Sequence, residues 1–418
     1  MKVTQREHGF SCNNTGVENS RILNKLLETY DKIEISEAGE YPLEGTILLG
    51  SNQSLIFGED VFIRREKTMK ETAYVIANKG AYTRTYDENI SVIGLKLITN
   101  GVESTYPQAE YTSVIPGLRG HISFFYVRNL VIKDFETKDT PPKDFAIHIC
   151  TFENVLVENA VVEGRKDAVH LGRGKNFVIR NGYFRTFDDP IALNAHDYAS
   201  SNPQLGWIEN GLIENCYDYN DDDTTGFFCR VLAGSWCDWY KGMQIQNSDT
   251  VIANGRMYRA LMKADGEIYI SNTAPAHTEG YEVIDGINWV FVQDEICYNC
   301  GCKNITFKDI YIEKDRPVAF SFHFDNDFYS RSVYPGSNAP VQENITFQNV
   351  NITGDVPVFL STATPAEHVK ITDSQLNGSV IKLIDLENVK EYPQTDFDWE
   401  NTETIEIDAE KRRTYKNK

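Results

Sequence analysis

Two short segments of the chain carry aspartates at a spacing that could support acid–base chemistry. Asp167 lies in the segment Gly164 to Leu171, and Asp188 and Asp189 lie in the segment Phe187 to Asn194. Three carboxyl groups held close together cannot all ionise cheaply, so at least one should keep a proton near neutral pH while another stays ionised. Hydrolysis of a glycosidic bond requires this division between an acid and a base.

A repeated pattern along the chain indicates how these segments are positioned. Asn, an apolar residue, any residue and a second apolar residue recur, starting at Asn89, Asn129, Asn154, Asn176, Asn210, Asn304 and Asn344, with a degenerate copy at His368. The shortest separations are 22 to 25 residues, and longer ones indicate loops. Short strands at this period are typical of a solenoid of stacked coils. We therefore predict an all-β fold, a right-handed parallel β-helix, in which the Asn side chains stabilise turns and stack on one another.

The aspartates are spaced by about one coil of this solenoid. Asp167 precedes the Asp188–Asp189 pair by 21 and 22 residues, so the two segments should lie on adjacent coils, a strand spacing of ~4.8 Å apart. The period-two alternation of strands sends Val169, Leu171, Ile191 and Leu193 inward and leaves Asp167, His170 and Asn194 on the outer face.

The ends and the longest gap of the repeat predict further elements. Ile22, Leu23, Leu26 and Leu27 have helical spacing and should form an N-terminal capping helix. The separation of 94 residues between Asn210 and Asn304 is too long for a coil. We expect a small inserted β module at residues 239–293, between coils in residues 1–238 and coils in residues 294–418.

Composition excludes several classes of partner. The 418 residues include 28 Gly and 14 Pro, and 61 acidic against 41 basic residues give a formal charge of -20. This charge argues against binding to nucleic acid or to an anionic membrane. The first thirty residues resemble no signal peptide, and no apolar run is long enough for a membrane span, so we predict a cytoplasmic protein, or a secreted one if a signal has been removed.

We predict no cofactor and no metal. Cys297, Cys300 and Cys302 resemble half of a zinc site, but no second pair at a suitable spacing completes it. The eight cysteines are few for this length and are expected to be reduced.

The two aspartate segments resemble glycoside hydrolase family 28, the polygalacturonases and their relatives. The resemblance covers roughly residues 80 to 385 and is strongest over residues 164 to 194. It implies a parallel β-helix that hydrolyses a carbohydrate by an inverting mechanism. By this resemblance Asp167 is the general acid, and Asp188 and Asp189 position and deprotonate water.

The activity expected from this resemblance is hydrolysis of O-glycosidic bonds with inversion at the sugar carbon. This sequence departs from the family at several positions: Arg165 and Lys166 stand where the family has Asn and Thr, Phe187 replaces a Gly, and neither Gly-His-Gly nor Arg-Ile-Lys is present. Those motifs help the family to bind galacturonate, so their absence puts pectin as the substrate in doubt and leaves open whether the sugar is a uronate. Basic and polar residues near the acids could hold the sugar instead. The expected substrate-binding residues are His170, Arg165, Asn194, His196 and Arg230.

The inserted segment loosely resembles carbohydrate-binding modules of families 5 and 12. The resemblance rests on Tyr258, Ala260 and the late Trp289, together with nearby glycines. It implies a sugar-binding role for the insert. The alternative is purely structural, with Tyr258 and Trp289 forming a small core.

Two other classes of function compete with a hydrolase. A β-helical polysaccharide lyase or epimerase would use a Lys or Arg base, usually with a metal that neutralises a uronate. A non-catalytic carbohydrate-binding protein, such as a phage-type adhesin, would bind glycans without turnover. The sequence leaves the sugar, the linkage and the oligomeric state open.

Overall fold

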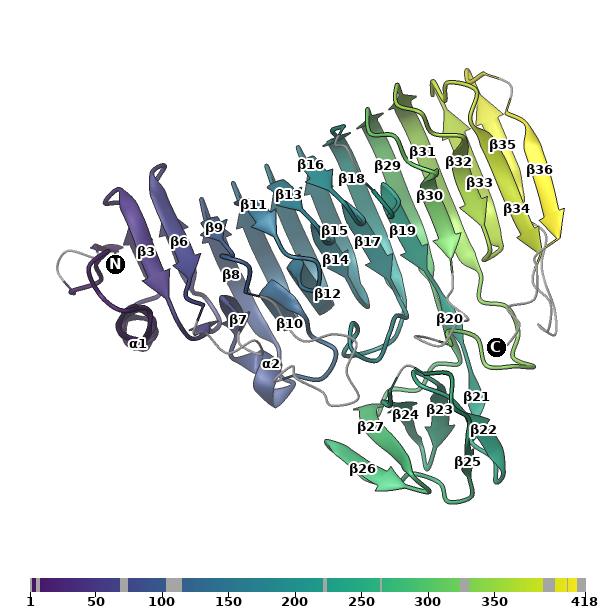
Figure 1. The fold of residues 1–418 in the computed structure, drawn as a ribbon, viewed down its shortest axis with the longest axis horizontal. Coiled ribbons are helices and arrows are strands. Elements are labelled where there is room, and N and C mark those ends of the chain that lie inside the picture. The colour runs from purple at the N-terminus through teal and green to yellow at the C-terminus, as the bar shows by residue number, and fades with distance from the viewer. Residues whose placement is uncertain are drawn as a thin grey trace.

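The computed structural model of the protein describes residues 2–4, 8–67, 74–102, 115–220, 224–263, 265–323, 331–385, 395–403 and 405–411. The described strands stack into an elongated parallel β-helix that runs from α1 at one end to β36 at the other (Figure 1). The predicted right-handed parallel β-helix is confirmed, with its capping helix and a small β insert. None of the helices in these ranges is long and apolar enough to cross a membrane.

Three parallel stacks of strands form the walls of the solenoid. The first stack contains β4 (Ile47–Leu49), β7 (Ile76–Asn78), β10 (Gly120–Lys133), β12 (Phe145–Glu158), β14 (Val169–Leu171), β17 (Ile191–Asn194), β19 (Cys229–Leu232), β30 (Val318–His323), β32 (Val358–Thr362), β34 (Val380–Asp385) and β36 (Ile407–Lys411). The second contains β1 (Lys2–Thr4), β2 (Lys32–Ile35), β5 (Ser54–Phe57), β8 (Asp87–Ile93), β15 (Gly174–Arg180), β18 (Ile208–Asp218), β29 (Cys302–Ile312), β31 (Gln342–Ile352), β33 (Ala366–Thr372) and β35 (Phe397–Glu400), together with the second halves of β10 and β12. The third contains β3 (Gly39–Leu43), β6 (Val61–Arg65), β9 (Lys96–Ile98), β11 (Glu136–Thr140), β13 (Val161–Gly164) and β16 (Tyr183–Thr186).

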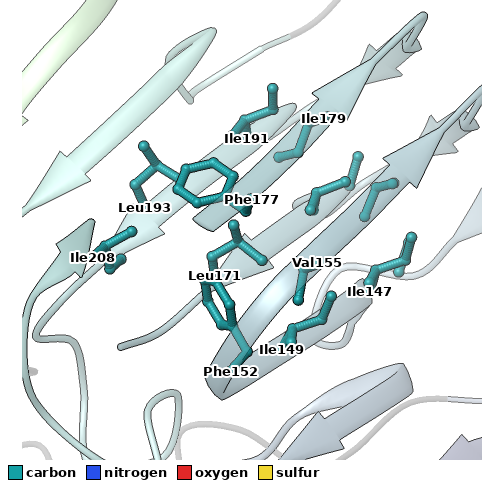
Figure 2. Close-up of a cluster of buried hydrophobic side chains, with 14 of the residues drawn as sticks. Ile147, Ile149, Phe152, Val155, Leu171, Phe177, Ile179, Ile191, Leu193 and Ile208 are labelled. Carbon is teal, nitrogen blue, oxygen red and sulfur yellow. The ribbon is translucent and has the colours of Figure 1, made fainter. Parts of the chain in front are cut away.

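Apolar side chains from all three walls fill the interior. Val169, Leu171, Ile191 and Leu193 are fully buried in one continuous core, as the alternation of each strand predicts. Figure 2 shows Leu171, Ile191 and Leu193 turned toward the side chains of the facing wall. The inward direction of these residues leaves the alternate positions of β14 and β17 on the outer surface, where the candidate site lies.

The recurrent asparagines form a ladder along one corner of the solenoid. Asn154 Nδ2 donates to Asn129 Oδ1 at 2.9 Å, and Asn176 Nδ2 donates to Asn154 Oδ1 at 3.2 Å. These residues adopt the left-handed conformation, with φ of 53° to 60°, which Asn tolerates better than most residues. The predicted stacking of Asn at turns is confirmed, and it fixes the register of successive coils.

The N-terminal end is closed by helix α1 (Gly16–Leu27). The Thr15 side chain accepts a hydrogen bond from the Glu18 backbone N–H at 3.2 Å and so caps the first turn. Leu23, Leu26 and Leu27 are buried on the first coil. The predicted capping helix therefore covers apolar surface that the first coil would otherwise expose. A second, short helix, α2 (Gly80–Thr83), precedes β8.

The long gap in the repeat holds a separate group of sheets beside the solenoid, below it in Figure 1. Its five-stranded sheet contains β21 (Cys237–Asp238), β23 (Thr250–Ala253), β24 (Arg256–Ala260), β27 (Ile287–Gln293) and β26 (Tyr281–Ile284), and β22 (Met243–Ile245) pairs with β25 (Tyr269–Ser271). The short strands β20 (Gly234–Ser235) and β28 (Asn299–Cys300) pair where the chain leaves and rejoins the coils.

Tyr258 and Trp289 lie inside this insert. Both side chains are fully buried, so neither ring offers a face on which a sugar could stack. Both side chains belong to the buried hydrophobic core, as the structural alternative expects. A carbohydrate-binding role for the insert would need other residues and stays a prediction.

Candidate active site

Adjacent turns of the solenoid carry the three aspartates. Asp167 lies between β13 and β14, and Asp188 and Asp189 lie between β16 and β17. Because β13 pairs with β16 and β14 pairs with β17, the two turns lie side by side on consecutive coils. A side-chain oxygen of each aspartate lies within 4.8 Å of the corresponding oxygens of the other two.

Asp167 is the most enclosed of the three. Its side chain has no exposed surface, and its Oδ2 lies 2.9 Å from His170 Nδ1 while its Oδ1 lies 3.3 Å from Lys166 Nζ. Burial by itself would raise the pKa of Asp167, but the Lys166 charge, the hydrogen bond with His170 and the charge of Arg230 outweigh it and lower the pKa below its usual range. Asp167 is therefore ionised.

Lys166 lies between two of the carboxyl groups. Besides Asp167, its ammonium forms an ion pair with Asp188, whose side chain is 24% exposed. Burial alone would lower the pKa of Lys166, but Asp167 and Asp188 raise it overall. The ammonium consequently stays charged and balances two neighbouring carboxylates.

The surroundings of Asp189 raise its pKa, whereas those of Asp167 lower the pKa of that carboxyl. Its side chain is 2% exposed, its Oδ1 accepts a hydrogen bond from the Phe227 backbone N–H at 2.8 Å, and its Oδ2 lies 3.2 Å from Arg230 Nε. Burial and the charge of Asp188 raise the pKa of Asp189 well above its usual range, against the opposing effect of Arg230. Asp189 is thus the carboxyl of the cluster that retains a proton.

Asp197 connects the cluster to a loop that follows β17. Its Oδ2 accepts a hydrogen bond from Asn194 Nδ2 at 2.6 Å and lies 3.5 Å from His170 Nε2 and 3.7 Å from Arg230 Nη2. Arg230 therefore bridges Asp189 and Asp197. This second pairing shares the guanidinium charge between two carboxyl groups.

A pocket of about 190 Å³ opens beside the cluster. Its lining residues are Arg119, Phe145, Lys166, Asp188, Asp189, Asp197, Tyr198, Ser201, Thr225, Gly226, Phe227 and Arg230. Asp188 and Asp189 both reach this pocket, whereas Asp167 lies behind them and is fully buried. A substrate in the pocket would therefore meet Asp188, paired with Lys166, next to Asp189, whose pKa is raised.

The predicted substrate-binding residues are divided between the pocket and the interior. Arg230 lines the pocket, and exposed Arg165 lies with its guanidinium 4.1 Å from the centre of the Phe187 ring. His170, Asn194 and His196 are fully buried. The expected accessibility of these three is not found, because side chains and loops cover the outer face of β14 and β17.

Specific contacts account for this covering. The His170 ring stacks on Phe145 with 3.9 Å between ring centroids, and Asn194 donates its hydrogen bond to Asp197. His196 lies against the insert, with Nε2 3.4 Å from Thr250 Oγ1. These side chains can hold the site in place but do not line its pocket.

Arg119, Phe145 and Phe227 are pocket residues that the sequence did not single out. Phe145 begins β12 on the coil before Asp167, Arg119 precedes β10 one coil earlier, and Phe227 precedes β19 on a later coil. Their neighbours in sequence carry no motif. The single available signal was the one-coil period, which places residues near β12 and β19 on either side of β14 and β17.

The spacing of the carboxyl groups differs from the expected inverting geometry. Inverting glycosidases separate their two carboxyl groups by roughly 6.5–9.5 Å to admit a water, whereas the clustered oxygens here lie within 4.8 Å. Three carboxylates so close together would also suit a divalent cation. Lys166 already supplies positive charge to two of them, so the chain itself provides the neutralising cation.

The fold places this chain in the class of parallel β-helix proteins, and its carboxyl cluster lies between adjacent coils. No family model and no curated protein matches the chain. Among solved structures, PfbA, a surface adhesin of Streptococcus pneumoniae, is 13% identical, with 97% of this chain and 91% of that chain covered and a TM-score of 0.51. A family 28 exopolygalacturonase of Yersinia enterocolitica is 12% identical, with 98% and 77% covered and a TM-score of 0.49.

A third similar structure is an endo-xylogalacturonan hydrolase from Aspergillus tubingensis, with 9% identity, 98% of this chain and 93% of that chain covered, and a TM-score of 0.46. Family 28 enzymes are therefore among the structures that this chain resembles, as the sequence predicted. At these identities the similarity shows a shared fold. A surface adhesin is among the proteins with this fold, so activity has to be argued from the site.

Proposed function

We propose that this chain is a glycoside hydrolase that cleaves O-glycosidic bonds of a poly- or oligosaccharide in the pocket beside Asp188 and Asp189. The observation that carries the proposal is the pairing of two pocket carboxyl groups in opposite environments. Asp188 contacts the charged Lys166, whereas buried Asp189 has a pKa raised well above its usual range by burial and by Asp188. A protonated acid next to an ionised carboxylate is the arrangement that glycoside hydrolysis uses.

In this proposal Asp189 protonates the departing glycosidic oxygen. Asp188, paired with the Lys166 ammonium, acts either on the attacking water or on the sugar carbon. The family resemblance gives the proton-donor role to Asp167, but the lowered pKa of Asp167, which Lys166, His170 and Arg230 hold down against its burial, favours Asp189. The position of Asp167 behind the pocket supports a role in holding Lys166 and His170.

The site offers less support for a lyase or an epimerase. Such an enzyme would need a neutral base to remove a proton from carbon, and Lys166 is the nearest lysine to the cluster carboxyls. Against the effect of burial, Asp167 and Asp188 raise the pKa of Lys166. A lysine held in its charged form is a poor base.

The test is a glycan panel in which new reducing ends are measured with the wild-type protein and with matched variants. Asp189→Asn should lower kcat/KM on the glycan by about 10²- to 10⁴-fold, because an amide cannot donate the proton. Asp294→Asn is the control, since this side chain is 79% exposed and lies outside the pocket lining. It should leave kcat/KM unchanged.

A substrate with a good leaving group distinguishes the roles of the aspartates. On an aryl glycoside of the same sugar, Asp189→Asn should regain much of its rate, because the leaving group no longer needs a proton, whereas Asp188→Asn should stay slow. Rescue of Asp167→Asn in place of Asp189→Asn would assign proton donation to Asp167. Tight glycan binding without any turnover would replace the hydrolase with a binding protein.

A further inference from the structure

The ammonium of Lys166 lies between two of the three clustered carboxyl groups. Its Nζ is 3.3 Å from Asp167 Oδ1 and forms a second ion pair with Asp188 Oδ2. The Lys166 side chain is 17% exposed, so water screens these contacts weakly. The lysine thus favours the ionised form of both aspartates.

Asp189 has a less favourable set of partners. Its cation is Arg230, at 3.2 Å, and the same guanidinium lies 3.7 Å from Asp197. The positive charge near Asp189 is therefore shared with a carboxyl group outside the cluster. The two carboxylates held by Lys166 lie within 4.8 Å of Asp189 and oppose its ionisation.

We infer that Lys166 is a positioning residue of the acid cluster: its ammonium holds Asp167 and Asp188 as carboxylates and thereby leaves the proton of the cluster on Asp189. This inference rests on the proposed function for its catalytic meaning. Lys166 acts through the aspartates and takes no part in bond breaking. It fixes which of three neighbouring acids is the donor.

Phe145 and Arg119 also contribute to the electrostatic environment of the Lys166 ammonium. The centre of the Phe145 ring lies 5.7 Å from Nζ, so the ring attracts the ammonium through a cation–π contact but exchanges no proton with it. Arg119, which also lines the pocket, repels the ammonium and lowers the pKa of Lys166, an effect smaller than the raising effects of Asp167 and Asp188. The two aspartates are therefore the partners that decide the charge of Lys166.

The first experiment measures kcat/KM against pH for the wild type, Lys166→Met and Lys166→Arg. Removing the ammonium deprives Asp167 and Asp188 of their shared cation, so the acidic limb of the profile should move to higher pH by about one pH unit or more in Lys166→Met. Lys166→Arg keeps the positive charge and should keep the limb near its wild-type position. Loss of activity by the same factor at every pH would mean that Lys166 is merely structural.

Lys175→Met is the matched control. Lys175 carries the same side chain, is 51% exposed and pairs with Glu153 on a face away from the pocket lining. Its replacement should leave both limbs of the profile unchanged. A shift of the acidic limb in this variant would show that the profile responds to net charge in general. It would contradict a specific effect of Lys166 on the acid cluster.

The second experiment reads protonation without any substrate. The carboxyl carbons of aspartate are labelled with ¹³C, and the NMR signals are assigned by their loss in Asp167→Asn, Asp188→Asn and Asp189→Asn. The Asp189 signal should report a protonated carboxyl near neutral pH and the other two should report carboxylates. In Lys166→Met the Asp167 signal should titrate at higher pH than in the wild type, because the Lys166 charge lowers the pKa of Asp167.

The two experiments fail independently. Unchanged titration of Asp167 in Lys166→Met would overturn the role of Lys166, even if the protein hydrolyses glycans. A shifted titration in a protein that cleaves no member of the panel would overturn the proposed function and leave the electrostatic role of Lys166 intact.

Discussion

Asp167 and Asp189 are both buried beside the same pocket, yet their surroundings act on their protons in opposite directions. Asp167 contacts Lys166 and His170, whereas Asp189 faces Asp188 and a shared Arg230. Burial raises the pKa of both aspartates, and the neighbouring charges decide the outcome. The protonation state of an acid in this cluster is consequently set more by the charged groups that contact it than by its burial.

The raised pKa of Asp189 has a consequence for stability that needs no substrate. Burial and Asp188 are its main causes, Asp167 adds to it, and Arg230 and the Phe227 N–H oppose it. Because the folded pKa exceeds the unfolded value of about 3.9, the folded state binds the extra proton, and the stability from Asp189 is present below pH ~3.9 and lost as pH rises through the folded pKa.

Asp189→Asn removes this titration. The melting temperature of the variant relative to the wild type should therefore rise as the pH increases from about 4 into the neutral range, because an amide carries no ionisation penalty. Differential scanning calorimetry at several pH values measures the difference. A difference that stays constant with pH would show that Asp189 titrates like an ordinary aspartate.

At the scale of elements, a buried ion pair holds the turn that carries Asp188. Arg316 donates to both carboxylate oxygens of Asp218, at 2.5 and 3.0 Å, and neither side chain is exposed. Arg316 Nη2 and Lys314 Nζ also donate to the Thr186 carbonyl, at 3.4 and 2.9 Å. Thr186 ends β16, two residues before Asp188. Later coils thus fix the end of this strand.

Arg316→Met should lower the free energy of unfolding by about 3–5 kcal/mol, because it leaves the Asp218 charge buried without its partner. Arg180→Met is the control: Arg180 is 41% exposed and pairs with Glu158, so its loss should cost less than about 1 kcal/mol. Urea denaturation followed by circular dichroism compares the two. Equal midpoints for both variants would show that the buried pair contributes no more than a surface pair.

At the scale of the whole molecule, the insert contacts the loop that follows β17. The Ser248 Oγ accepts from the Ala199 N–H at 2.9 Å, Arg259 Nη1 donates to the Asn202 carbonyl at 3.3 Å, and the Leu205 N–H donates to Gln293 Oε1 at 3.1 Å. The same loop supplies Asp197, Tyr198 and Ser201 to the pocket. The insert therefore supports one wall of the candidate active site.

Replacing residues 239–293 with a short linker should leave the β-helix folded, since the coils on both sides pair through β18 and β29 and through β19 and β30. The loop would lose its partners, so kcat/KM should fall by about tenfold or more. Circular dichroism measures whether the β-helix is folded, and the glycan assay measures kcat/KM. The control is Tyr281→Ser, which changes a side chain that is 69% exposed on β26. This control should change neither the circular dichroism spectrum nor kcat/KM.

Loss of cooperative unfolding in the linker variant would make the insert part of the solenoid core. Wild-type kcat/KM in a folded linker variant would show that the loop keeps its conformation without the insert. Either result contradicts the supporting role inferred from the contacts of Ser248, Arg259 and Gln293.

The sequence determined the solenoid because the signals that specify it are local and repeated. Alternating apolar residues fix which side of each strand faces the core, and Asn154 and its equivalents tolerate the left-handed turn that starts each repeat. The one-coil spacing also placed Asp167 beside Asp188 and Asp189, because parallel coils bring residues one period apart into contact.

Tertiary structure alone decided which of these acids keeps a proton and which predicted residues reach the pocket. The Arg230 guanidinium, the Phe145 ring over His170 and the Asp197 loop come from other coils and from a turn whose length the repeat does not set. Ionisation depends on distances of a few ångströms to such groups and on their exclusion of water. A periodic pattern specifies neighbours along the solenoid axis, but it carries no information about the loops that cover them.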